Sequence, residues 1–179
     1  MEKEIVIKPI FEFNVVFSAN KYLWYSRMSN KILIIFISFF LFIFILLTLF
    51  SLIFSTKTEL NESYNLLINS GPTSLVIFLI PIFHYAIVYN NSKKLINNYR
   101  LSENIELIFN KDFFEEKGDT FDIKYYWDKL YKIKERKSYF LIYQNKNLAN
   151  IIPKTNITNN QYNELKKLFN SLNIKKSLK

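Results

Sequence analysis

Two long apolar runs interrupt the first half of the chain. The first, ILIIFISFFLFIFILLTLFSLIF at residues 32–54, has no charged residue and contains 20 Ile, Leu or Phe among its 23 positions. As a helix it is about 35 Å long, which suffices to cross a hydrocarbon core of about 30 Å. It is too long for a signal-peptide core and follows 31 residues that include three glutamates. The run therefore predicts a transmembrane helix rather than a cleaved signal peptide.

The second run, SGPTSLVIFLIPIFHYAIVYN at residues 70–90, is shorter and contains Pro81 and His84. A proline inside a span bends the helix, and neighbouring helices in lipid tolerate the backbone group that it leaves unpaired. We therefore expect a second transmembrane helix at residues 73–89. A re-entrant segment is the alternative.

The charges beside the two runs predict their orientation. Residues 1–31 contain five Lys or Arg and residues 90–103 contain three, whereas the connection at 55–72 has one Lys against two Glu. Because basic residues concentrate on the cytoplasmic side of a membrane, both termini are expected in the cytoplasm and residues 55–72 outside. The prediction is a helical hairpin in the inner (plasma) membrane, and the abundance of Lys, Asn, Ile, Phe and Tyr suggests a bacterial source.

After residue 104 apolar positions alternate with polar ones. Ile123, Tyr125 and Trp127, for example, share one face of an extended segment, with Asp122 and Lys124 on the other. Such alternation of β-branched and aromatic residues with polar ones indicates half-buried antiparallel strands. Five segments show it, separated by turn-like polar stretches: 104–110, 120–127, 130–136, 138–144 and 147–153.

A helix is predicted after the strands. Thr158 and Gln161 match a capping box. An apolar stripe then repeats at helical spacing through Tyr162, Leu165, Leu168, Phe169 and Leu172. Because this stripe needs a sheet to cover, we expect residues 104–179 to form a small α+β domain, an antiparallel meander capped by a C-terminal amphipathic helix. Residues 90–103 would link it to the second span.

The N-terminal segment also alternates before it reaches the membrane. Its apolar positions are Ile5, Ile7, Phe11, Phe13 and Val15. We expect this segment to add strands to the cytoplasmic sheet, since it lies on the same side of the membrane and an added strand protects an edge of a small domain. Residues 18–29 are then predicted as helix or turn leading into the first span.

Several local motifs follow one another in a distinctive order. They are the acidic-aromatic DFFEE, the YWDKL that contains Trp127, the SYFLIY strand, and the IIPK that leads into the helix. Together with two preceding apolar runs, this order resembles the YcxB-like family of bacterial membrane proteins, most convincingly over residues 104–172. The resemblance implies a cytoplasmic domain similar to a pleckstrin-homology-like sheet with a capping helix. It implies no established biochemical activity.

Composition limits the chemistry of the chain. It has no cysteine, one histidine and two glycines, which excludes disulfides and thiolate chemistry and argues against a Gly-rich phosphate loop. Five acidic residues gather near one turn, but they lack the ligand spacing of a calcium loop, and we expect a solvated turn there. These are Asp112, Glu115, Glu116, Asp119 and Asp122. We therefore expect a non-enzymatic protein without metal or cofactor.

The net charge of +9 draws attention to the basic residues of the sheet domain. Candidate lipid- or partner-binding residues lie on one strand, its turn and the next turn: Lys132, Lys134, Arg136, Lys137 and Lys146. Beneath an anionic leaflet such a surface gains roughly 1 kcal/mol per well-placed basic residue. An ordinary solvated face is the alternative, and the interspersed acids disfavour nucleic-acid binding.

Three further residues have competing interpretations. Trp127 is expected in the core of the sheet domain, with its indole N–H bonded to a backbone carbonyl. Pro81 and His84 are candidate functional residues inside the membrane, since polar groups there are often functional. A lone histidine without an acidic partner is, however, better explained by a hydrogen bond to the backbone that Pro81 frees, or by a place near the interface.

These observations favour an inner-membrane-anchored protein whose cytoplasmic domain binds a protein partner or the membrane surface. Two spans would raise the local concentration of the domain at the membrane, so that weak contacts suffice. The alternatives are a peripheral sensor of anionic lipid and, less well supported, a subunit of a small transporter or channel. The last needs oligomers, because two helices cannot enclose a pathway.

Overall fold

The computed structural model describes residues 4–54, 79–97 and 104–179. The chain divides into two compact units. One combines Met1–Trp24 with Val88–Lys179, and the other comprises Tyr25–Ile87. The first unit is therefore assembled from both ends of the sequence, which flank the apolar region.

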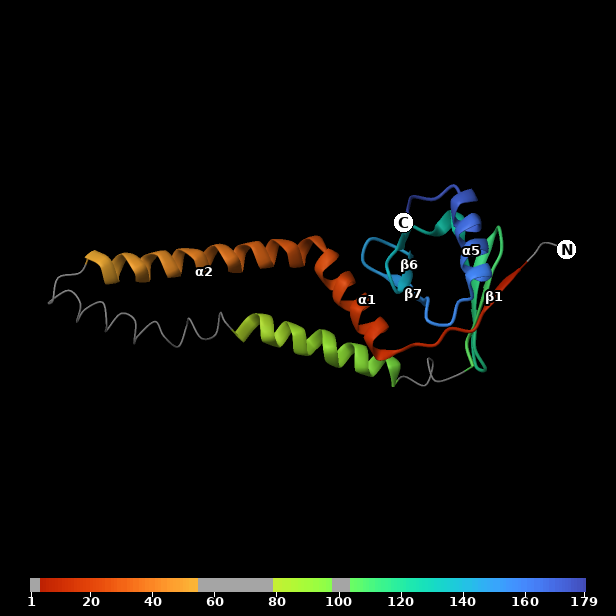
Figure 1. The fold of residues 1–179 in the computed structure, drawn as a ribbon, viewed down its shortest axis with the longest axis horizontal. Helices are drawn as coiled ribbons and strands as arrows, with labels where there is room; N and C mark the ends of the chain where they lie inside the picture. Colours follow the sequence, from red (N-terminus) through yellow and green to blue (C-terminus); the bar gives the residue numbers. More distant parts are fainter. Residues whose placement is uncertain (1–3, 55–78, 98–103) are drawn as a thin grey trace. The chain divides into compact units, whose positions relative to one another are not determined.

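The long apolar helix belongs to the second unit. Helix α2 extends from Met28 to Phe54 and follows α1 (Phe13–Ser26) after a break at Arg27 (Figure 1). By length and composition, Met28–Phe50 is suited to cross a membrane, with a mean hydropathy of 3.2 and no buried residue in that stretch. The helix predicted at 32–54 is confirmed, and it begins earlier, at Met28.

Residues 79–96 form a further helix that contains Pro81 and His84. It includes the second part of the span predicted at 73–89 and continues through the first residues of the expected linker at 90–103. Residues 73–78, the expected external connection at 55–72 and the linker residues 98–103 lie outside the described residues. Within the described ranges one helix has the length and composition of a membrane span, so the second span stays a prediction.

Four antiparallel strands form the first sheet, in the order β1-β2-β3-β4. They are β1 (Ile5–Ile7), β2 (Glu106–Phe109), β3 (Phe113–Lys117) and β4 (Asp122–Tyr126). β1 pairs with β2 and places Ile5 opposite Phe109, which confirms that the N-terminal segment joins the C-terminal sheet. β3 was not predicted as a strand.

The second sheet has the order β7-β6-β5-β8. Its members are β5 (Lys132–Glu135), β6 (Tyr139–Tyr143), β7 (Ala149–Pro153) and β8 (Lys176–Ser177). β5, β6 and β7 pair antiparallel, whereas the short β8 runs parallel to β5. The expected single meander is thus two sheets, because a 3₁₀ turn at Trp127–Lys129 separates β4 from β5 and turns Trp127 into the core.

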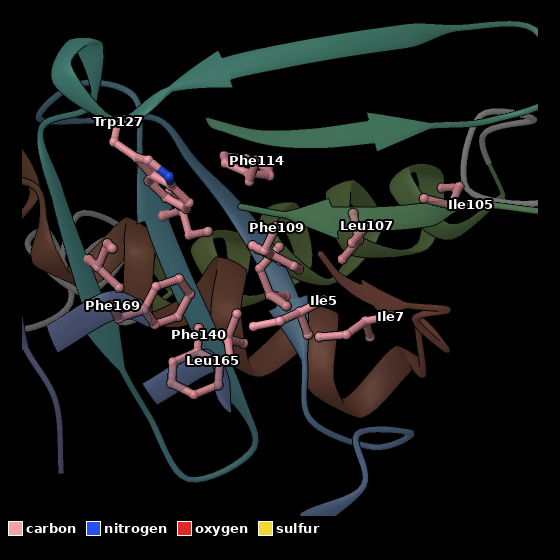
Figure 2. Close-up of a cluster of buried hydrophobic side chains, with 13 residues drawn as sticks. Ile5, Ile7, Ile105, Leu107, Phe109, Phe114, Trp127, Phe140, Leu165 and Phe169 are labelled. Carbon is pink, nitrogen blue, oxygen red and sulfur yellow. The ribbon is translucent and has the colours of Figure 1, made fainter. Parts of the chain in front are cut away.

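Both sheets and helix α5 (Asn159–Ser171) contribute to one apolar core (Figure 2). Trp127 is 6% exposed and donates its indole N–H to the carbonyl of Asn110 at 2.9 Å, as predicted. The ring of Phe169 on α5 packs edge-on against Trp127 and Phe140. Burying one such large side chain contributes about 1.5–3 kcal/mol. The buried members are Ile5, Ile7, Ile105, Leu107, Phe109, Phe114, Trp127, Ile133, Phe140, Ile142, Ile152, Leu165 and Phe169.

Helix α5 has the predicted cap. The Thr158 side chain accepts from the Gln161 N–H, and the Gln161 side chain accepts from the Thr158 N–H. Leu165 and Phe169 are fully buried, and the remaining members of the stripe pack against the core. At the other end the Lys176 ammonium donates to the carbonyls of the last turn, which supplies the partners that a helix C-terminus lacks.

Helix α1 covers the outer face of the second sheet. Its buried residues Val15 and Ala19 pack against Tyr139, Leu141 and Tyr143 of β6. The expectation of a strand through Phe11, Phe13 and Val15 is wrong, because the strand ends at Ile7 and the helix begins at Phe13. The sheet face offers an apolar surface that one helix stripe can cover, and this tertiary contact overrides the local alternation.

The acidic residues near the first hairpin agree only in part with the expected solvated turn. Asp112, Asp119 and Asp122 are exposed, but Glu115 and Glu116 belong to β3. Glu115 is 8% exposed and forms an ion pair of 3.5 Å with Lys124 on β4. Glu115 and Glu116 thus lie in a paired strand, and the turn between β3 and β4 comprises only residues 118–121.

Candidate functional site

Strand β5 carries basic side chains on one face. Side chains alternate along a strand, so Ile133 and Glu135 are buried and the residues between them lie on the opposite face. Three of the five predicted candidates therefore come together, two on the strand and one directly after it. We call these partly exposed residues the basic row: Lys132, Lys134 and Arg136.

Aromatic rings hold the basic row in place. Lys132 Nζ lies 4.4 Å from the ring centre of Tyr143 on the neighbouring β6. Lys134 Nζ and the Arg136 guanidinium carbon lie 5.1 and 4.2 Å from the ring centre of Tyr22 on α1. A cation over an aromatic face gains about 0.5–1 kcal/mol at an exposed site. The rings thus restrain the cations without neutralising their charge.

The charge of the basic row is not compensated by other described residues. Its three side chains form no ion pair within the described ranges, whereas Lys124 and Lys154 pair with Glu115 and Glu135. The neighbouring helix α1 contains no acidic residue and adds Lys21. This face of the domain consequently presents a positive potential to an approaching anion.

The other two predicted candidates lie at opposite ends of the second sheet. Lys137 is exposed in the turn between β5 and β6, next to Arg136. Lys146 is exposed in the turn between β6 and β7. Because β6 lies between the two turns, they are separated by roughly 17 Å. Lys137 therefore follows the basic row directly in the sequence, and Lys146 lies apart from Lys137.

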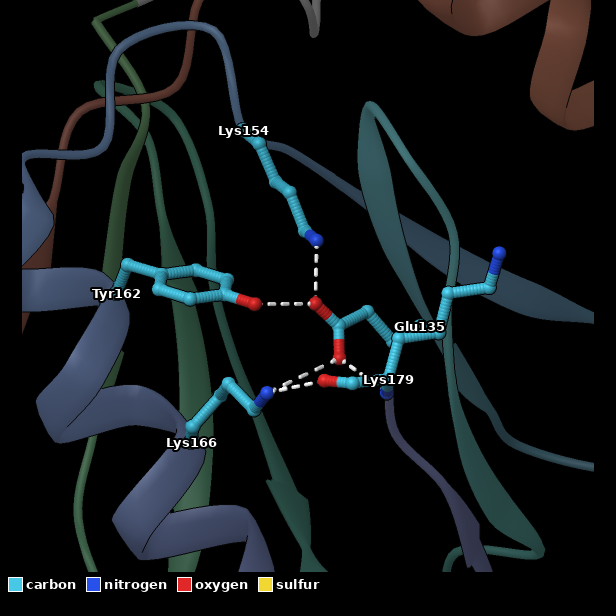
Figure 3. Close-up of polar contacts among 5 residues, drawn as sticks. All are labelled: Glu135, Lys154, Tyr162, Lys166 and Lys179. Carbon is cyan, nitrogen blue, oxygen red and sulfur yellow. Dashed lines mark hydrogen bonds and ion pairs between the residues drawn. The ribbon is translucent and has the colours of Figure 1, made fainter.

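A second polar cluster, which sequence reasoning missed, surrounds the carboxylate of Glu135 (Figure 3). Glu135 is 3% exposed, and its Oε1 accepts hydrogen bonds from Lys154 Nζ and Tyr162 Oη, both at 2.6 Å. Its Oε2 accepts from the backbone N–H of Lys179 at 2.7 Å and lies 3.8 Å from Lys166 Nζ. We call these five residues the Glu135 cluster. It ties β5 to α5 and to the segment after β8.

The contacts in the Glu135 cluster determine its ionisation. Burial alone raises the pKa of Glu135, but the hydrogen bonds from Lys154, Tyr162 and the Lys179 N–H together outweigh it and lower the pKa. The pKa of Tyr162 is raised, first by its hydrogen bond to the carboxylate, which only the neutral phenol can donate, and then by burial. At neutral pH the cluster therefore combines an ionised carboxylate with a neutral phenol, an arrangement suited to holding segments together.

A cavity of about 270 Å³ lies within the sheet unit. Its walls are mainly apolar, with Leu107, Phe121 and Tyr125 among them, and include Glu116, which accepts a hydrogen bond of 2.7 Å from Asn150 Nδ2. This volume is below the roughly 300–1,000 Å³ typical of small-molecule sites. The described acidic and histidine side chains form no group of three or more that could hold a metal ion. The basic row is the stronger candidate.

The two candidates in the second apolar run share one helix. His84 Nδ1 lies 3.0 Å from the carbonyl oxygen of Ile80, one turn earlier. A proline within a helix leaves the carbonyl four residues before it unpaired, and for Pro81 that position is residue 77, which lies outside the described residues. The histidine thus contacts a backbone carbonyl as expected, but a different one from the carbonyl that Pro81 frees.

Comparison with known proteins identifies the family of the sheet domain. Residues 109–169, about a third of the chain, match the family described as YcxB-like protein. This confirms the resemblance based on the motifs around Trp127. The matched segment contains β5 with the basic row, and it contains Glu135 with its partners Lys154, Tyr162 and Lys166. No curated protein matches the chain, and no solved structure does.

Proposed function

We propose that this chain is a non-enzymatic, membrane-anchored protein whose YcxB-like domain binds anionic lipid headgroups through the basic row. The observation that carries the proposal is the convergence of Lys134 and Arg136 on the ring of Tyr22, without an ion-pair partner among the described residues. Cations that are held in place and left uncompensated suit the phosphate and carboxylate groups of a lipid surface.

The pairing of β1 with β2 supports a two-span anchor. These strands precede and follow the apolar region in the sequence, yet they belong to one sheet. A sheet forms in one compartment, so a chain that crosses the membrane at α2 must cross back before β2. This favours a second span at residues 73–89. The charges beside the spans favour the cytoplasm for both termini and the inner membrane for the protein.

The architecture also agrees with a pleckstrin-homology-like module. Two sheets share one core, and a C-terminal helix packs onto it. We propose that the sheet domain is pleckstrin-homology-like, since such an arrangement leaves strand ends and turns available to bind headgroups. In this chain the basic row, together with Lys137 in the following turn, occupies one of these positions.

Only a short stretch of chain connects Tyr22, which contacts two residues of the basic row, to the apolar helix α2. Tyr22 lies six positions before Met28, where α2 begins. This stretch can extend by at most roughly 20 Å. At roughly 1 kcal/mol per basic residue near an anionic surface, the three cations contribute about 3 kcal/mol. Because the anchor already supplies a high effective concentration, this modest energy is enough to hold the domain against the membrane.

The proposal is tested with the full chain reconstituted in vesicles. The chain lacks cysteine, so Ser138→Cys in the exposed turn beside Arg136 accepts a single fluorophore. Quenching by spin-labelled lipid headgroups then reports how often this turn contacts the membrane. We expect stronger quenching in phosphatidylcholine–phosphatidylserine vesicles than in phosphatidylcholine alone, and a decline with added salt. Lys134→Glu/Arg136→Glu should abolish the difference between the two lipids.

A matched control carries the same change of charge elsewhere. Lys167 and Lys175 are exposed and lie outside the basic row, and Lys167→Glu/Lys175→Glu should retain the preference for phosphatidylserine. If both double variants lose the preference for phosphatidylserine equally, the preference depends on net charge and not on the basic row. If the protein with an unmodified basic row is quenched equally in vesicles with and without phosphatidylserine, lipid binding by this face is refuted.

A further inference from the structure

Strand β4 is an edge of the first sheet, and its outward backbone groups have no partner among the described residues. The Gly118 N–H donates to the Phe121 carbonyl and the Trp127 N–H to the Asp112 carbonyl, which sets the alternation of the β3–β4 ladder. Every second residue of β4 then bonds to β3, and the N–H and C=O groups of the others point to the open edge. The outward residues are Asp122, Lys124 and Tyr126, all exposed.

The other sheet edges have features that block pairing. On β1 the outward carbonyl of Val6 accepts from Gln161 Nε2 at 2.9 Å, and the following carbonyl of Lys8 accepts from Asn156 Nδ2 at 3.2 Å. β7 ends in Pro153, which cannot donate, and β8 has only two residues. β4 and β7 have equal length, but within the described strands only β4 combines this length with a complete set of outward N–H and C=O groups.

The charges along β4 are complementary to themselves. On the outer face Lys124 lies opposite Glu115 and Asp122 lies opposite Lys117. When a second β4 approaches antiparallel with Asp122 opposite Lys124 of the other copy, each row across the joined sheets alternates in sign. The neighbouring register would place Lys124 opposite Lys124, which is unfavourable. The edge thus favours one register of self-pairing.

We propose that β4 is a self-association edge, through which two copies of this chain join their first sheets around a two-fold axis at Ile123. The pairing supplies about four central backbone hydrogen bonds and two cross-strand ion pairs between Asp122 and Lys124. Anchoring in one membrane raises the local concentration of copies. The basic row lies in the other sheet, so this inference does not depend on lipid binding.

Disulfide formation tests the register directly. Across the two-fold axis Ile123 faces Ile123 of the second copy at a Cα–Cα distance of about 4.5 Å, which a disulfide can span. In native membranes, full-length Ile123→Cys should give a disulfide dimer on mild oxidation. The matched control is Val6→Cys, on the opposite edge of the same sheet and 41% exposed, which should stay monomeric.

Charge variants in the Ile123→Cys background test the ion pairs. Asp122→Lys and Lys124→Asp should each lower the dimer yield by about tenfold, because like charges then face each other. When the two variants carry tags of different size and are made in one cell, a mixed dimer should form, since opposite charges meet again. In a Trp24→Phe background, an unchanged emission of the buried Trp127 verifies that each purified variant is folded.

Three outcomes would overturn the proposal. They are a dimer yield of Ile123→Cys no higher than that of Val6→Cys, folded charge variants that give no mixed dimer, and an adduct whose mass identifies a different protein as the partner of this edge.

Discussion

The Glu135 cluster should be the most sensitive polar site of the sheet domain. In Glu135→Gln the side-chain shape is kept, but the charge is lost and an amide N–H₂ takes the place of one carboxylate oxygen. That group then faces the Lys179 N–H and the Lys166 ammonium, which are donors themselves. The contacts from Lys154 and Tyr162 persist but weaken, because the acceptor is no longer a carboxylate and the bond from Tyr162 becomes a neutral one.

The expected cost follows from these contacts. Hydrogen bonds to a charged group contribute about 1.5–3 kcal/mol and neutral ones about 1 kcal/mol, and an unsatisfied buried donor costs about 1–3 kcal/mol. Weakening two bonds and losing a third predicts that Glu135→Gln lowers the free energy of unfolding by about 3 kcal/mol. Removal of one partner from a buried ion pair has a similar cost. The equilibrium constant for unfolding should rise roughly a hundredfold.

Denaturant unfolding of the full chain measures this change. In a Trp24→Phe background the emission of Trp127 reports on the sheet domain alone, since the chain has two tryptophans. The control is Asp128→Asn, which breaks the exposed pair between Asp128 and Lys129 and should cost less than about 1 kcal/mol. A shift for Glu135→Gln no larger than that of the control would refute the reasoning.

The same variant predicts a dependence on pH. Because the pKa of Glu135 is lowered in the folded protein, its contribution is complete above the ordinary value of 4.5. It is lost as the pH falls through the folded-state value. The difference in unfolding free energy between the unmodified protein and Glu135→Gln should therefore be constant near neutral pH and shrink below about 4.5. A constant difference down to low pH would contradict an ionised Glu135.

Two further predictions concern the core and the helix cap. Trp127→Phe removes the donor to the buried Asn110 carbonyl and should cost about 1–3 kcal/mol in circular-dichroism melts, whereas a melt within experimental error of the unmodified protein would contradict that role. Thr158→Ala removes one half of the capping box and should cost about 1 kcal/mol, and Thr158→Ser should restore the stability.

Periodicity in the sequence was sufficient to predict a strand or helix where all residues on one of its faces are apolar. The alternation through Ile123 and Tyr125 predicted β4, and the capping box predicted the start of α5. β3 escaped prediction because FFEEK places two aromatic and two acidic residues side by side. Only the pairing of β3 with its neighbours shows that Phe114 and Glu116 lie on one face of the sheet. Phe113 and Glu115 lie on the other face.

The candidate site was predictable in part. The lysines of β5 were visible as alternating charges, but the ring that holds two members of the basic row, Tyr22, lies more than a hundred residues earlier. A single sequence contains no signal for such a contact. Glu135 could have been noticed, since it follows Ile133 at an inward position and a buried carboxylate requires donors. Its actual donors are Lys154 directly after β7, Tyr162 on α5 and the backbone N–H of Lys179, and only the tertiary structure brings them together.

The division of the first sheet between the two ends of the chain has a consequence for biosynthesis. Ile5 emerges from the ribosome early, whereas its partner Phe109 is synthesised 104 residues later. At about 5–20 residues per second, β1 waits for roughly 5–20 s. During that interval α2 is already available for insertion into the membrane. Under the proposed membrane anchoring, translation order would make the insertion of α2 precede the completion of the first sheet.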